Sequence, residues 1–441
     1  MSVTSQISGG SAREVAASIE SAVRSGALAR GAALPSVREL SGALALSPVT
    51  IVAALRELRQ RGIVLTRERR GTIVNPRPPL PQALAPAPLP RGTRDLANGL
   101  PDPRLLPHGP GVLPRVALPT ESYPDEATLP ELVVQGRRQF AEAGVRADDL
   151  CVTSGALDGV ERALEAHLAP GDGVLVEDPG YPATFDLLRA MGLVPIPVAI
   201  DDRGVQPKAL GQALGGGGAR AIILTPRGQN PTGAAFDQDR VKAIREILRR
   251  APDLLVVEDD HQGPLSGVEG QTVTVGRRTW AVVRSVAKSL GPDLRLAFVA
   301  GDTETVSRVA GRFALGPGWV SYIIERAVLE LLKSATVRAQ LARATRTYAE
   351  RREALLAALA EQKIAASGRS GFNVWIPVAD EGVVTAALLQ AGWAVSPGAR
   401  FRITTPPAVR VTTAALLPEE SRRFARDLAR ALRASPRPRR A

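Results

Sequence analysis

The chain has 441 residues, of which 44% are hydrophobic and 23% charged, so it is long enough to bury two or more cores. The single cysteine, Cys151, excludes an intramolecular disulfide framework, and with only three histidines it argues against a dedicated zinc site. The net charge of +12 is densest in residues 1–75, where ten arginines accompany five glutamates, and this favours a polyanionic partner. No apolar run of membrane-spanning length and no signal-peptide pattern occur, which predicts a cytoplasmic protein without a membrane partner.

Three helices are predicted near the N-terminus. The first is indicated by Val15, Ile19 and Val23, which recur at helical spacing. The second begins at the capping box Ser36-Val-Arg-Glu39, and the third begins at Ser47-Pro48, because proline is tolerated at a first helical position. Each of these helices has a single apolar stripe, so we expect them to pack around one small core.

Residues 63–66 and 71–74 are predicted to pair as a short hairpin whose tip, residues 67–70, is basic. Three helices followed by such a hairpin predict a winged helix-turn-helix domain, whose third helix enters the major groove of DNA while arginines contact phosphates. The pattern alone also fits a helical domain whose arginines are merely solvated. The residues expected to contact DNA are Arg38, Ser47, Thr50, Arg67, Arg69, Arg70 and Gly71.

The segments Leu34-Pro-Ser-Val-Arg-Glu-Leu40, Ser47-Pro-Val-Thr50 and Gly71-Thr-Ile-Val74 resemble the N-terminal domain of GntR-type bacterial regulators. The resemblance spans that whole domain and implies double-stranded DNA as a partner. Pro48 is a departure, because that family usually has a basic residue beside the serine.

A proline-rich spacer follows at residues 76–93, with seven prolines in eighteen residues. It predicts a boundary between a DNA-binding domain at 1–75 and a larger domain at 94–433. Residues 434–441 are polar and basic, and we expect this tail to be disordered.

After the spacer, short apolar runs alternate with amphipathic stretches, which predicts a mostly parallel α/β sheet. A long helical region is expected at about 312–352, followed by a smaller C-terminal α+β subdomain that includes 371–376 and 409–412. The predicted strands are 150–153, 173–177, 193–198, 219–225, 254–258, 280–283 and 296–300.

Lys288 is one of only five lysines, against 51 arginines, and it follows a predicted strand in Ser285-Val-Ala-Lys288. A lysine that binds pyridoxal phosphate as an imine needs such a place, with hydroxyl and guanidinium groups nearby for the phosphate. Ser285 and Arg295 meet that need. The same S-x-x-K pattern also occurs in serine acyl enzymes and by chance.

Other predicted strand ends carry complementary chemistry. The turn that contains Gly155 opens a helix and offers backbone amides to a phosphate. Tyr181 can stack on an aromatic ring, although such an aromatic is as often a core residue. Asn230 and Asp259 precede Lys288 at equal steps of 29 residues, each at a strand end. An amide suits a phenolate oxygen, and a buried carboxylate suits a pyridine nitrogen.

Together these residues resemble the fold-type I pyridoxal-phosphate aminotransferases. The resemblance implies Lys288 as the Schiff-base lysine, Asp259 on the pyridine nitrogen, Asn230 on the phenolic oxygen, Tyr181 on the ring and Arg410 on a substrate carboxylate. It implies a phosphate site made of Gly155, Ala156, Leu157, Ser285 and Arg295. Lys288 and Asp259 are the expected catalytic residues.

Three departures from the aminotransferase pattern lie in this set. His261 or Gln262 stands near the usual tyrosine that contacts the phenolic oxygen, so we place His261 at the cofactor. Ala156-Leu157 replaces a polar pair on the phosphate turn, and Ala287 lacks a hydroxyl commonly found before the lysine. We expect fewer phosphate donors to weaken cofactor binding and a changed phenolate partner to shift the pKa of the aldimine. The pattern still supports cofactor binding more strongly than turnover.

A GntR-type domain joined by a spacer to an aminotransferase-like domain resembles the MocR subgroup of regulators, and the match spans nearly the whole chain. The resemblance implies a homodimer that binds DNA and senses pyridoxal phosphate, or its external aldimine with a small amine or amino acid. Two alternatives remain open: an active aminotransferase, and a regulator whose larger domain no longer holds the cofactor.

Overall fold

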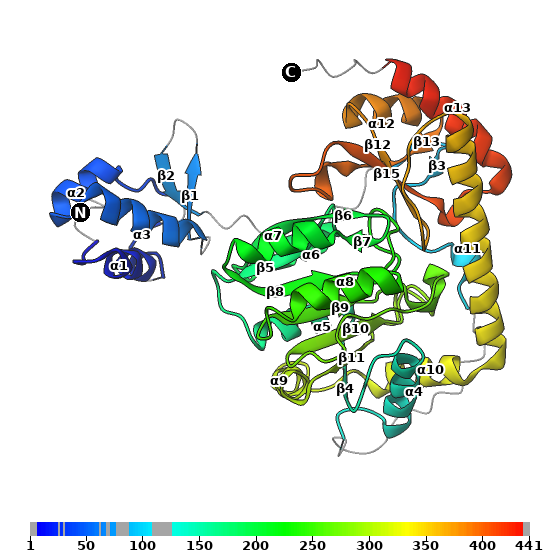
Figure 1. Cartoon of the computed structure of the whole chain (residues 1–441), viewed down its shortest axis with the longest axis horizontal. Helices are drawn as coiled ribbons and strands as arrows, with labels where there is room; N and C mark the ends of the chain where they lie inside the picture. Colours follow the sequence, from blue (N-terminus) through cyan, green and yellow to red (C-terminus); the bar gives the residue numbers. More distant parts are fainter. Residues whose placement is uncertain are drawn as a thin grey trace. The chain divides into compact units, whose positions relative to one another are not determined.

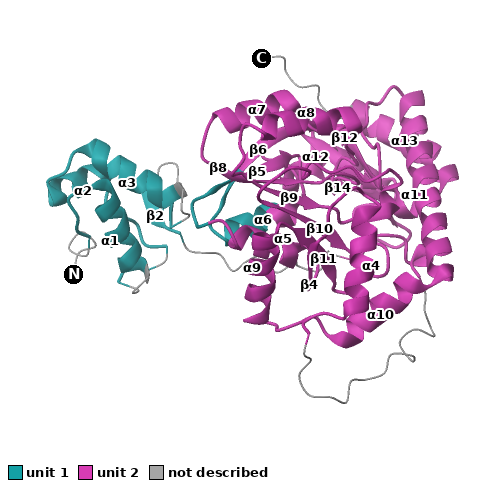
Figure 2. Cartoon of the chain, turned by 60° about the horizontal axis from the view of Figure 1, so that its bottom comes forward, with its two compact units in different colours: residues 1–87, 169–173, 185–195 teal, residues 88–168, 174–184, 196–441 magenta. Residues whose placement is uncertain are grey.

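The computed structural model describes residues 7–24, 27–29, 31–60, 63–67, 71–75, 88–107 and 126–434. Its contacts divide the chain into two compact units, which Figure 2 shows in different colours. Unit 1 comprises residues 1–87 with 169–173 and 185–195, and unit 2 comprises 88–168, 174–184 and 196–441. The division after residue 87 falls inside the proline-rich segment 76–93.

The three predicted helices and the hairpin are present in the N-terminal part of unit 1. The apolar stripes of the helices meet in one core that includes Val15, Ile19, Leu40 and Ile51. The hairpin strands pair antiparallel, with Val64 opposite Val74. The elements are α1 (Ala12–Arg24), α2 (Val37–Leu44), α3 (Pro48–Gln60), β1 (Val64–Arg67) and β2 (Gly71–Val74).

Side-chain caps fix where α2 and α3 begin. In the predicted capping box, the amide of Ser36 donates to Glu39 Oε2 at 2.7 Å and the amide of Glu39 donates to Ser36 Oγ at 3.2 Å. Ala45, at φ 52°, ends α2 in the left-handed conformation. The amide of Thr50 then donates to Ser47 Oγ at 3.1 Å, so the serine caps α3.

Among the described residues no single helix has the length and hydropathy to cross a membrane. Within the part of the chain that the structure describes, one bent pair, α2 with Pro48–Arg59 at 117°, passes that test by length and composition.

Unit 2 is built on an eight-stranded sheet with the order β4-β11-β10-β9-β8-β5-β6-β7 (Figure 1). All seven predicted strands are present, and β7 is an addition. The strands are β4 (Asp149–Thr153), β5 (Gly173–Asp178), β6 (Val194–Asp201), β7 (Gly204–Val205), β8 (Ala219–Leu224), β9 (Leu255–Asp259), β10 (Trp280–Ser285) and β11 (Ala297–Gly301).

The sheet is mixed: its centre is parallel, as predicted, and β11 is reversed. Strands β8, β9 and β10 run parallel, but β11 runs antiparallel to both β10 and β4. The segment between β10 and β11, residues 286–296, contains no helix in the structure. A parallel return needs a longer crossover, so β11 turns back directly beside β10.

Successive residues of β11 point to opposite faces of the sheet and each face receives a helix. Phe298 meets Gly136, where an added Cβ would lie 2.8 Å from the Phe298 ring, and Val299 meets Gly159, where it would lie 3.0 Å from Val299. These two glycines let the helices sit close to the sheet. The helices of this region are α4 (Pro130–Ala141), α5 (Ala156–Glu165), α6 (Pro182–Ala190), α7 (Pro207–Gly215), α8 (Gln238–Leu248), α9 (Thr303–Ala314) and α10 (Tyr322–Lys333).

The expected helical region at about 312–352 is the end of α9, then α10, then most of α11 (Ala335–Glu361), a long helix that Figure 1 shows leading toward the C-terminal subdomain. Gly316-Pro-Gly318 and the cap Ser334 break the helices apart. The predicted small subdomain is present, with the sheet order β12-β15-β14 and a second pair, β13 with β3. Its elements are β3 (Arg94–Asp95), β12 (Asn373–Pro377), α12 (Glu381–Gln390), β13 (Trp393–Ala394), β14 (Ser396–Pro397), β15 (Ala408–Thr412) and α13 (Pro418–Ala434).

Candidate functional site

Three of the predicted site residues come from neighbouring parallel strands. Asp259 is the last residue of β9, Lys288 follows β10, and Asn230 follows β8. Because β8, β9 and β10 are adjacent and parallel, their carboxyl ends lie on one edge of the sheet. This edge is where open α/β sheets bind their ligands.

Lys288 is half-buried, and its Nζ donates to the backbone carbonyl of Gly99 at 2.9 Å. Burial lowers the pKa of this amine to about 8, and the nearby charge of Arg410 lowers it further in the same direction. The neutral amine, which is the nucleophilic form, is therefore far more populated at neutral pH than in an ordinary lysine.

Asp259 is buried, and its Oδ1 has no hydrogen-bond partner. Burial raises the pKa of this carboxyl to about 7, and the negative charge of Asp260 raises it further. An orphaned carboxylate oxygen is costly in a protein interior, so the position suits a ligand that brings a donor, such as a protonated pyridine nitrogen.

His261 lies beside this carboxylate but does not neutralise it. Its Nδ1 is 3.9 Å from Asp259 Oδ2, and burial lowers the pKa of the imidazole to about 4, aided by the charge of Lys288. The imidazole is therefore neutral at physiological pH. Gln262, the other candidate for the usual tyrosine position, donates instead to the Gly228 carbonyl at 3.1 Å.

Arg410 reaches the site from β15 of the C-terminal subdomain. It donates to Asn230 Oδ1 at 3.0 Å and to the backbone carbonyl of Ala97, and its guanidinium stacks 4.8 Å from the ring centre of Phe401. Burial lowers the pKa of Arg410 to about 10, which leaves it cationic at neutral pH. Its buried Nε has no partner, so the group retains a donor for an incoming carboxylate.

The predicted phosphate turn has the backbone such a turn needs. Gly155 has φ 104° and immediately precedes α5, so the amides of the first turn, Ala156 and Leu157 among them, point out of the helix. An added Cβ at Gly155 would lie 2.7 Å from Arg295 Nη2, which shows that the arginine reaches this turn. Glycine therefore keeps open a cradle between a helix N-terminus and a guanidinium.

Ser285 and Tyr181 lie at the same edge. Ser285 is paired with Ala297, which is paired in turn with Thr153 at the start of the phosphate turn, and Ser285 Oγ accepts from the amide of Ala287 at 3.1 Å. Tyr181 is 41% exposed. Its phenol pKa is raised by desolvation and next by Asp259, and the charges of Arg410 and Arg295 act in the opposite direction.

Several contributors had no sequence signal. The carbonyls of Ala97 and Gly99 are backbone groups, which any residue type supplies. Gln229 Nε2 donates to Glu177 Oε2 at 3.2 Å and locks the turn that carries Asn230. Both residues are buried, and burial raises the pKa of Glu177 to about 7.

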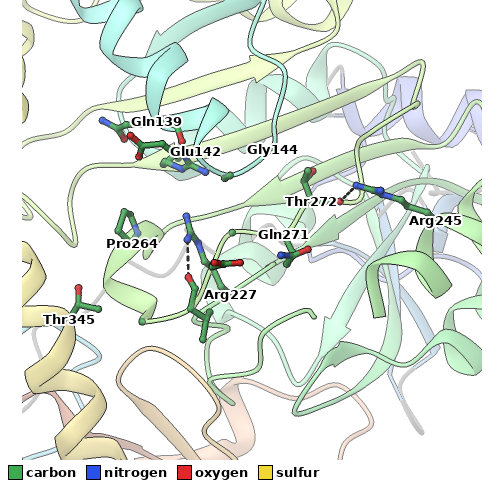
Figure 3. Close-up of a pocket in the computed structure, with 15 residues that line it drawn as sticks. Gln139, Glu142, Gly144, Arg227, Arg245, Pro264, Gln271, Thr272 and Thr345 are labelled. Atoms are coloured by element: carbon green, nitrogen blue, oxygen red, sulfur yellow. Dashed lines mark hydrogen bonds between the residues drawn. The ribbon is translucent and has the colours of Figure 1, made fainter. Parts of the chain in front are cut away.

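A separate hollow of about 700 Å³ opens beside this region, and Figure 3 shows residues that line it. Arg227 and Arg284 project from its wall and hold the buried carboxylate of Asp260 between them, each at 2.8 Å. The pKa of Asp260 is accordingly held well below its usual range by these two guanidiniums, against the effect of burial. None of the predicted cofactor residues lines this hollow, so the ion cluster positions the end of β9 from outside the candidate site.

The predicted DNA-contacting residues fall into two groups. Arg38 is exposed on α2, Ser47 caps α3 and Thr50 lies in its first turn, and Gly71 is exposed at φ 73°. The hydroxyls of Ser47 and Thr50 already bond to each other at 2.8 Å. Arg67 ends β1 but its side chain is not described, and Arg69 and Arg70 lie outside the described residues. Sequence reasoning missed Val49, an apolar residue of α3 that is 78% exposed.

Comparison with known families and proteins gives two matches along the chain. Residues 11–74 match the family of bacterial regulatory proteins of the gntR family, and residues 126–428 match aminotransferase class I and II. The vitamin B6 salvage pathway transcriptional repressor PtsJ of Salmonella typhimurium is 37% identical over 97% of this chain and 99% of its own. The pyridoxine biosynthesis transcriptional regulator PdxR of Corynebacterium glutamicum is 28% identical over 75% of this chain and 74% of its own.

Solved structures agree on the fold of the larger domain. The multiple substrate aminotransferase of Thermococcus profundus has a TM-score of 0.71 at 20% identity and covers 78% of this chain and 92% of its own. The LysN α-aminoadipate aminotransferase of Thermus thermophilus has a TM-score of 0.68 at 24% identity and covers 78% and 93%. The chain therefore belongs to the GntR family of bacterial transcriptional regulators, in the MocR subgroup that joins a winged helix-turn-helix domain to an aminotransferase class I and II domain.

Proposed function

We propose that this regulator binds pyridoxal phosphate at the edge formed by β8, β9 and β10, and that occupancy of this site changes how its winged domains bind DNA. Lys288 would hold the aldehyde carbon, Asp259 the pyridine nitrogen, Asn230 the phenolic oxygen, and Gly155 with Arg295 the phosphate. The bound cofactor supplies an aldehyde that condenses reversibly with primary amines, which gives the protein a means of detecting an amino compound.

The observation that carries the proposal is the orphaned Oδ1 of Asp259. In the free protein the pKa of this carboxyl is about 7, so it is partly protonated, because burial makes its charged form unfavourable. A donor placed against Oδ1 stabilises the charged form and offsets the free-energy cost of burying it. Lys288 contributes an amine at the end of the next strand, and the guanidinium of Arg410 can bind a carboxylate.

The proposal is tested by adding pyridoxal phosphate to the full-length protein and measuring the visible absorbance of the bound cofactor. We expect a band that Lys288→Ala abolishes and that Asp259→Asn weakens. Lys242→Ala is the matched control, because Lys242 is an exposed lysine of α8 paired with Asp239 at 3.8 Å. An equal band in Lys288→Ala and in Lys242→Ala would refute the assignment of the lysine.

The relatives support a role in vitamin B6 metabolism. PtsJ is a transcriptional repressor of the vitamin B6 salvage pathway and PdxR is a transcriptional regulator of pyridoxine biosynthesis, and the match to PtsJ covers nearly all of both chains. We therefore place pyridoxal phosphate itself among the effectors, alone or with an amine. We further propose a cytoplasmic homodimer with domains at 1–75 and 94–433, a spacer at 76–93 and a basic tail at 434–441.

An active aminotransferase is the second candidate, because Lys288, Asp259 and Arg410 suffice in principle for amino-group transfer. His261 disfavours it, since a neutral imidazole stands near the position where the aminotransferase pattern has a phenol. Multiple-turnover transamination with common amino donors decides between the two: sustained turnover favours the enzyme, whereas one turnover or none leaves the regulator.

A further inference from the structure

Residues 94–102, near the beginning of unit 2, cross the candidate site, and we call this segment the strap. Its beginning is held in the small subdomain, where β3 pairs with β13 and the buried Leu96 exchanges bonds with the subdomain backbone: its amide donates to Ala394 and its carbonyl accepts from Thr412, each at 2.8 Å. Its end is held by Asp102, whose amide donates to the Tyr348 hydroxyl at 3.1 Å.

The anchor at Asp102 is also an ion cluster. The carboxylate of Asp102 is 2% exposed and accepts from Arg351 at 2.9 Å and from Arg104 at 2.8 Å. Arg351 lies on α11 and is itself buried. In the ligand-free protein both ends of the strap are therefore held by elements outside the site, and its middle is the part that contacts the site.

That middle contacts the two cations on which the proposed ligand site depends. The carbonyl of Gly99 accepts from Lys288 Nζ at 2.9 Å, and the carbonyl of Ala97 accepts from Arg410. Gly99 has φ 68°, and an added Cβ would lie 3.1 Å from both terminal nitrogens of Arg410. The strap thus lies directly against the guanidinium and presents neutral acceptors where a ligand would present charged ones.

A carboxylate outcompetes a carbonyl for a buried guanidinium. Bonds between Arg and a carboxylate are charge-assisted and two-pronged, whereas a single carbonyl is neutral and one-pronged. The unpartnered Nε of Arg410 gives the second prong. Pyridoxal phosphate competes in turn for Lys288, since condensation of the amine with the aldehyde, with loss of one water, takes the amine away from Gly99.

We propose that residues 94–102 form a latch between the effector site and the DNA-binding domain, and that the ligands which open it fully are amino acids, that is, primary amines that also carry a carboxylate. The inference rests on the proposed function, because it needs pyridoxal phosphate at Lys288. The amine of the amino acid takes the place of Lys288 on the cofactor, and the carboxylate takes Arg410 from Ala97, so the contact between the strap and Arg410 is lost as well.

The latch has a direct covalent route to the DNA-binding domain. The N-terminal segment of unit 1 ends at Ala87 and unit 2 begins at Pro88, so β3 at Arg94 is the first element after this boundary. A strap that leaves the site changes the attachment of the spacer without any need for contact between the units.

Hydrogen exchange of the full-length protein, read by mass spectrometry on peptides covering residues 94–102, tests the latch. The amides of Leu96 and Asp102 report directly, because both are hydrogen-bonded across the strap's anchors. With pyridoxal phosphate present, we expect the common α-amino acids that alter cofactor absorbance to speed exchange by about fivefold or more, as expected for a locally opened segment. Ethylamine, which is alanine without its carboxylate, serves as the matched amine and should leave the exchange at the level set by pyridoxal phosphate alone.

Two glycine variants test the latch without any ligand. Gly99→Ala adds a methyl group against Arg410 and should speed exchange of the strap. Gly92→Ala is the control, because Gly92 also has a positive φ, of 81°, but an added Cβ there meets nothing within 4 Å. Backbone strain is thus similar in the two variants and only the contact with Arg410 differs.

The outcomes separate the latch from the function on which it rests. No cofactor band that depends on Lys288 defeats both. Four other results overturn the latch while a normal band leaves the cofactor site standing. In the first two, amino-acid binding leaves the exchange unchanged, or alanine and ethylamine have equal effects. In the other two, no common amino acid alters the band, or Gly99→Ala and Gly92→Ala behave alike.

Discussion

Arg410 donates to the side-chain oxygen of Asn230 at 3.0 Å, and this bond joins β15 of the small subdomain to the turn that follows β8 of the large sheet. The candidate site is therefore assembled from the small subdomain and the large sheet of unit 2. A ligand that binds Arg410 must compete with groups already bonded to it, so ligand binding is coupled to the contacts between the subdomain and the sheet.

Replacement of Arg410 by lysine should separate binding of the cofactor from binding of an amino acid. Lysine keeps the charge but offers a point donor in place of a planar fork, so we expect affinity for carboxylate-bearing amines to fall about 10- to 100-fold. Affinity for pyridoxal phosphate should change little. Both are measured by titration of the cofactor absorbance. Arg400→Lys is the control, because Arg400 is exposed and is not bonded to Asn230; equal losses in both variants would contradict the assignment.

Asp259 predicts a particular pH dependence of stability in the cofactor-free protein. Its folded pKa is raised from 3.8 to about 7, so the folded state binds more protons than the unfolded state between these values, and stability falls as pH rises from about 4 to about 7. Asp259→Asn should shrink the difference between the free energies of unfolding at pH 5 and pH 8 by roughly 2–4 kcal/mol. Urea denaturation at the two pH values measures it.

A residual dependence of the same sign should persist in Asp259→Asn. Burial also raises the pKa of Glu177 and of Glu258 to about 7. Asp253→Asn, at an exposed carboxylate near Arg278, should leave the difference unchanged. A pH dependence that is identical in wild type and Asp259→Asn would show that this carboxyl titrates normally.

Lys288 sets the pH dependence of cofactor capture. Its pKa of about 8 means that the reactive neutral amine increases about tenfold per pH unit below that value and levels off above it. The rate at which the cofactor band appears should follow the same curve between pH 6 and pH 9.5. Arg410→Met removes a nearby positive charge and should move the midpoint upward. A rate still rising steeply at pH 9.5 in the wild type would indicate an ordinary lysine.

The sequence was sufficient to place Asn230, Asp259 and Lys288 at one edge of a sheet, because buried parallel strands read as apolar runs and the chemical residues follow each run directly. It could not identify the carbonyls of Ala97 and Gly99, since a backbone acceptor has no residue signature. The sequence also could not predict the direction of β11, because hydrophobic runs look alike in parallel and antiparallel strands. The partnership of Gln229 with Glu177 arises only when β5 and β8 become neighbours in the sheet.

Val49 predicts a contribution to sequence recognition that polar residues do not supply. It is exposed at the start of α3, and the hydroxyls of Ser47 and Thr50 on the same turn are already bonded to each other. An exposed β-branched side chain there suits a thymine methyl group in the major groove. Val49→Ala should weaken binding to the operator by about 1 kcal/mol and leave binding to unrelated duplex unchanged, which competition binding assays measure. An equal loss on both DNAs would assign Val49 to folding instead.

Arg38 predicts the opposite pattern, a loss that does not depend on DNA sequence. It is exposed in the first turn of α2, within the capping-box segment, where the helix crosses the phosphate backbone in a winged helix-turn-helix. Arg38→Ala should lower the slope of log affinity against log salt concentration by roughly one, because one fewer phosphate counterion is released. Arg69→Ala, outside the described residues, is expected from the sequence to do the same. Arg13→Ala, an exposed arginine of α1, is the control. The slope reports the number of ionic contacts and does not depend on the bases, so random-sequence duplex is sufficient for the measurement. A slope that is unchanged in Arg38→Ala but falls in Arg13→Ala would place the phosphate contact on α1 instead of α2.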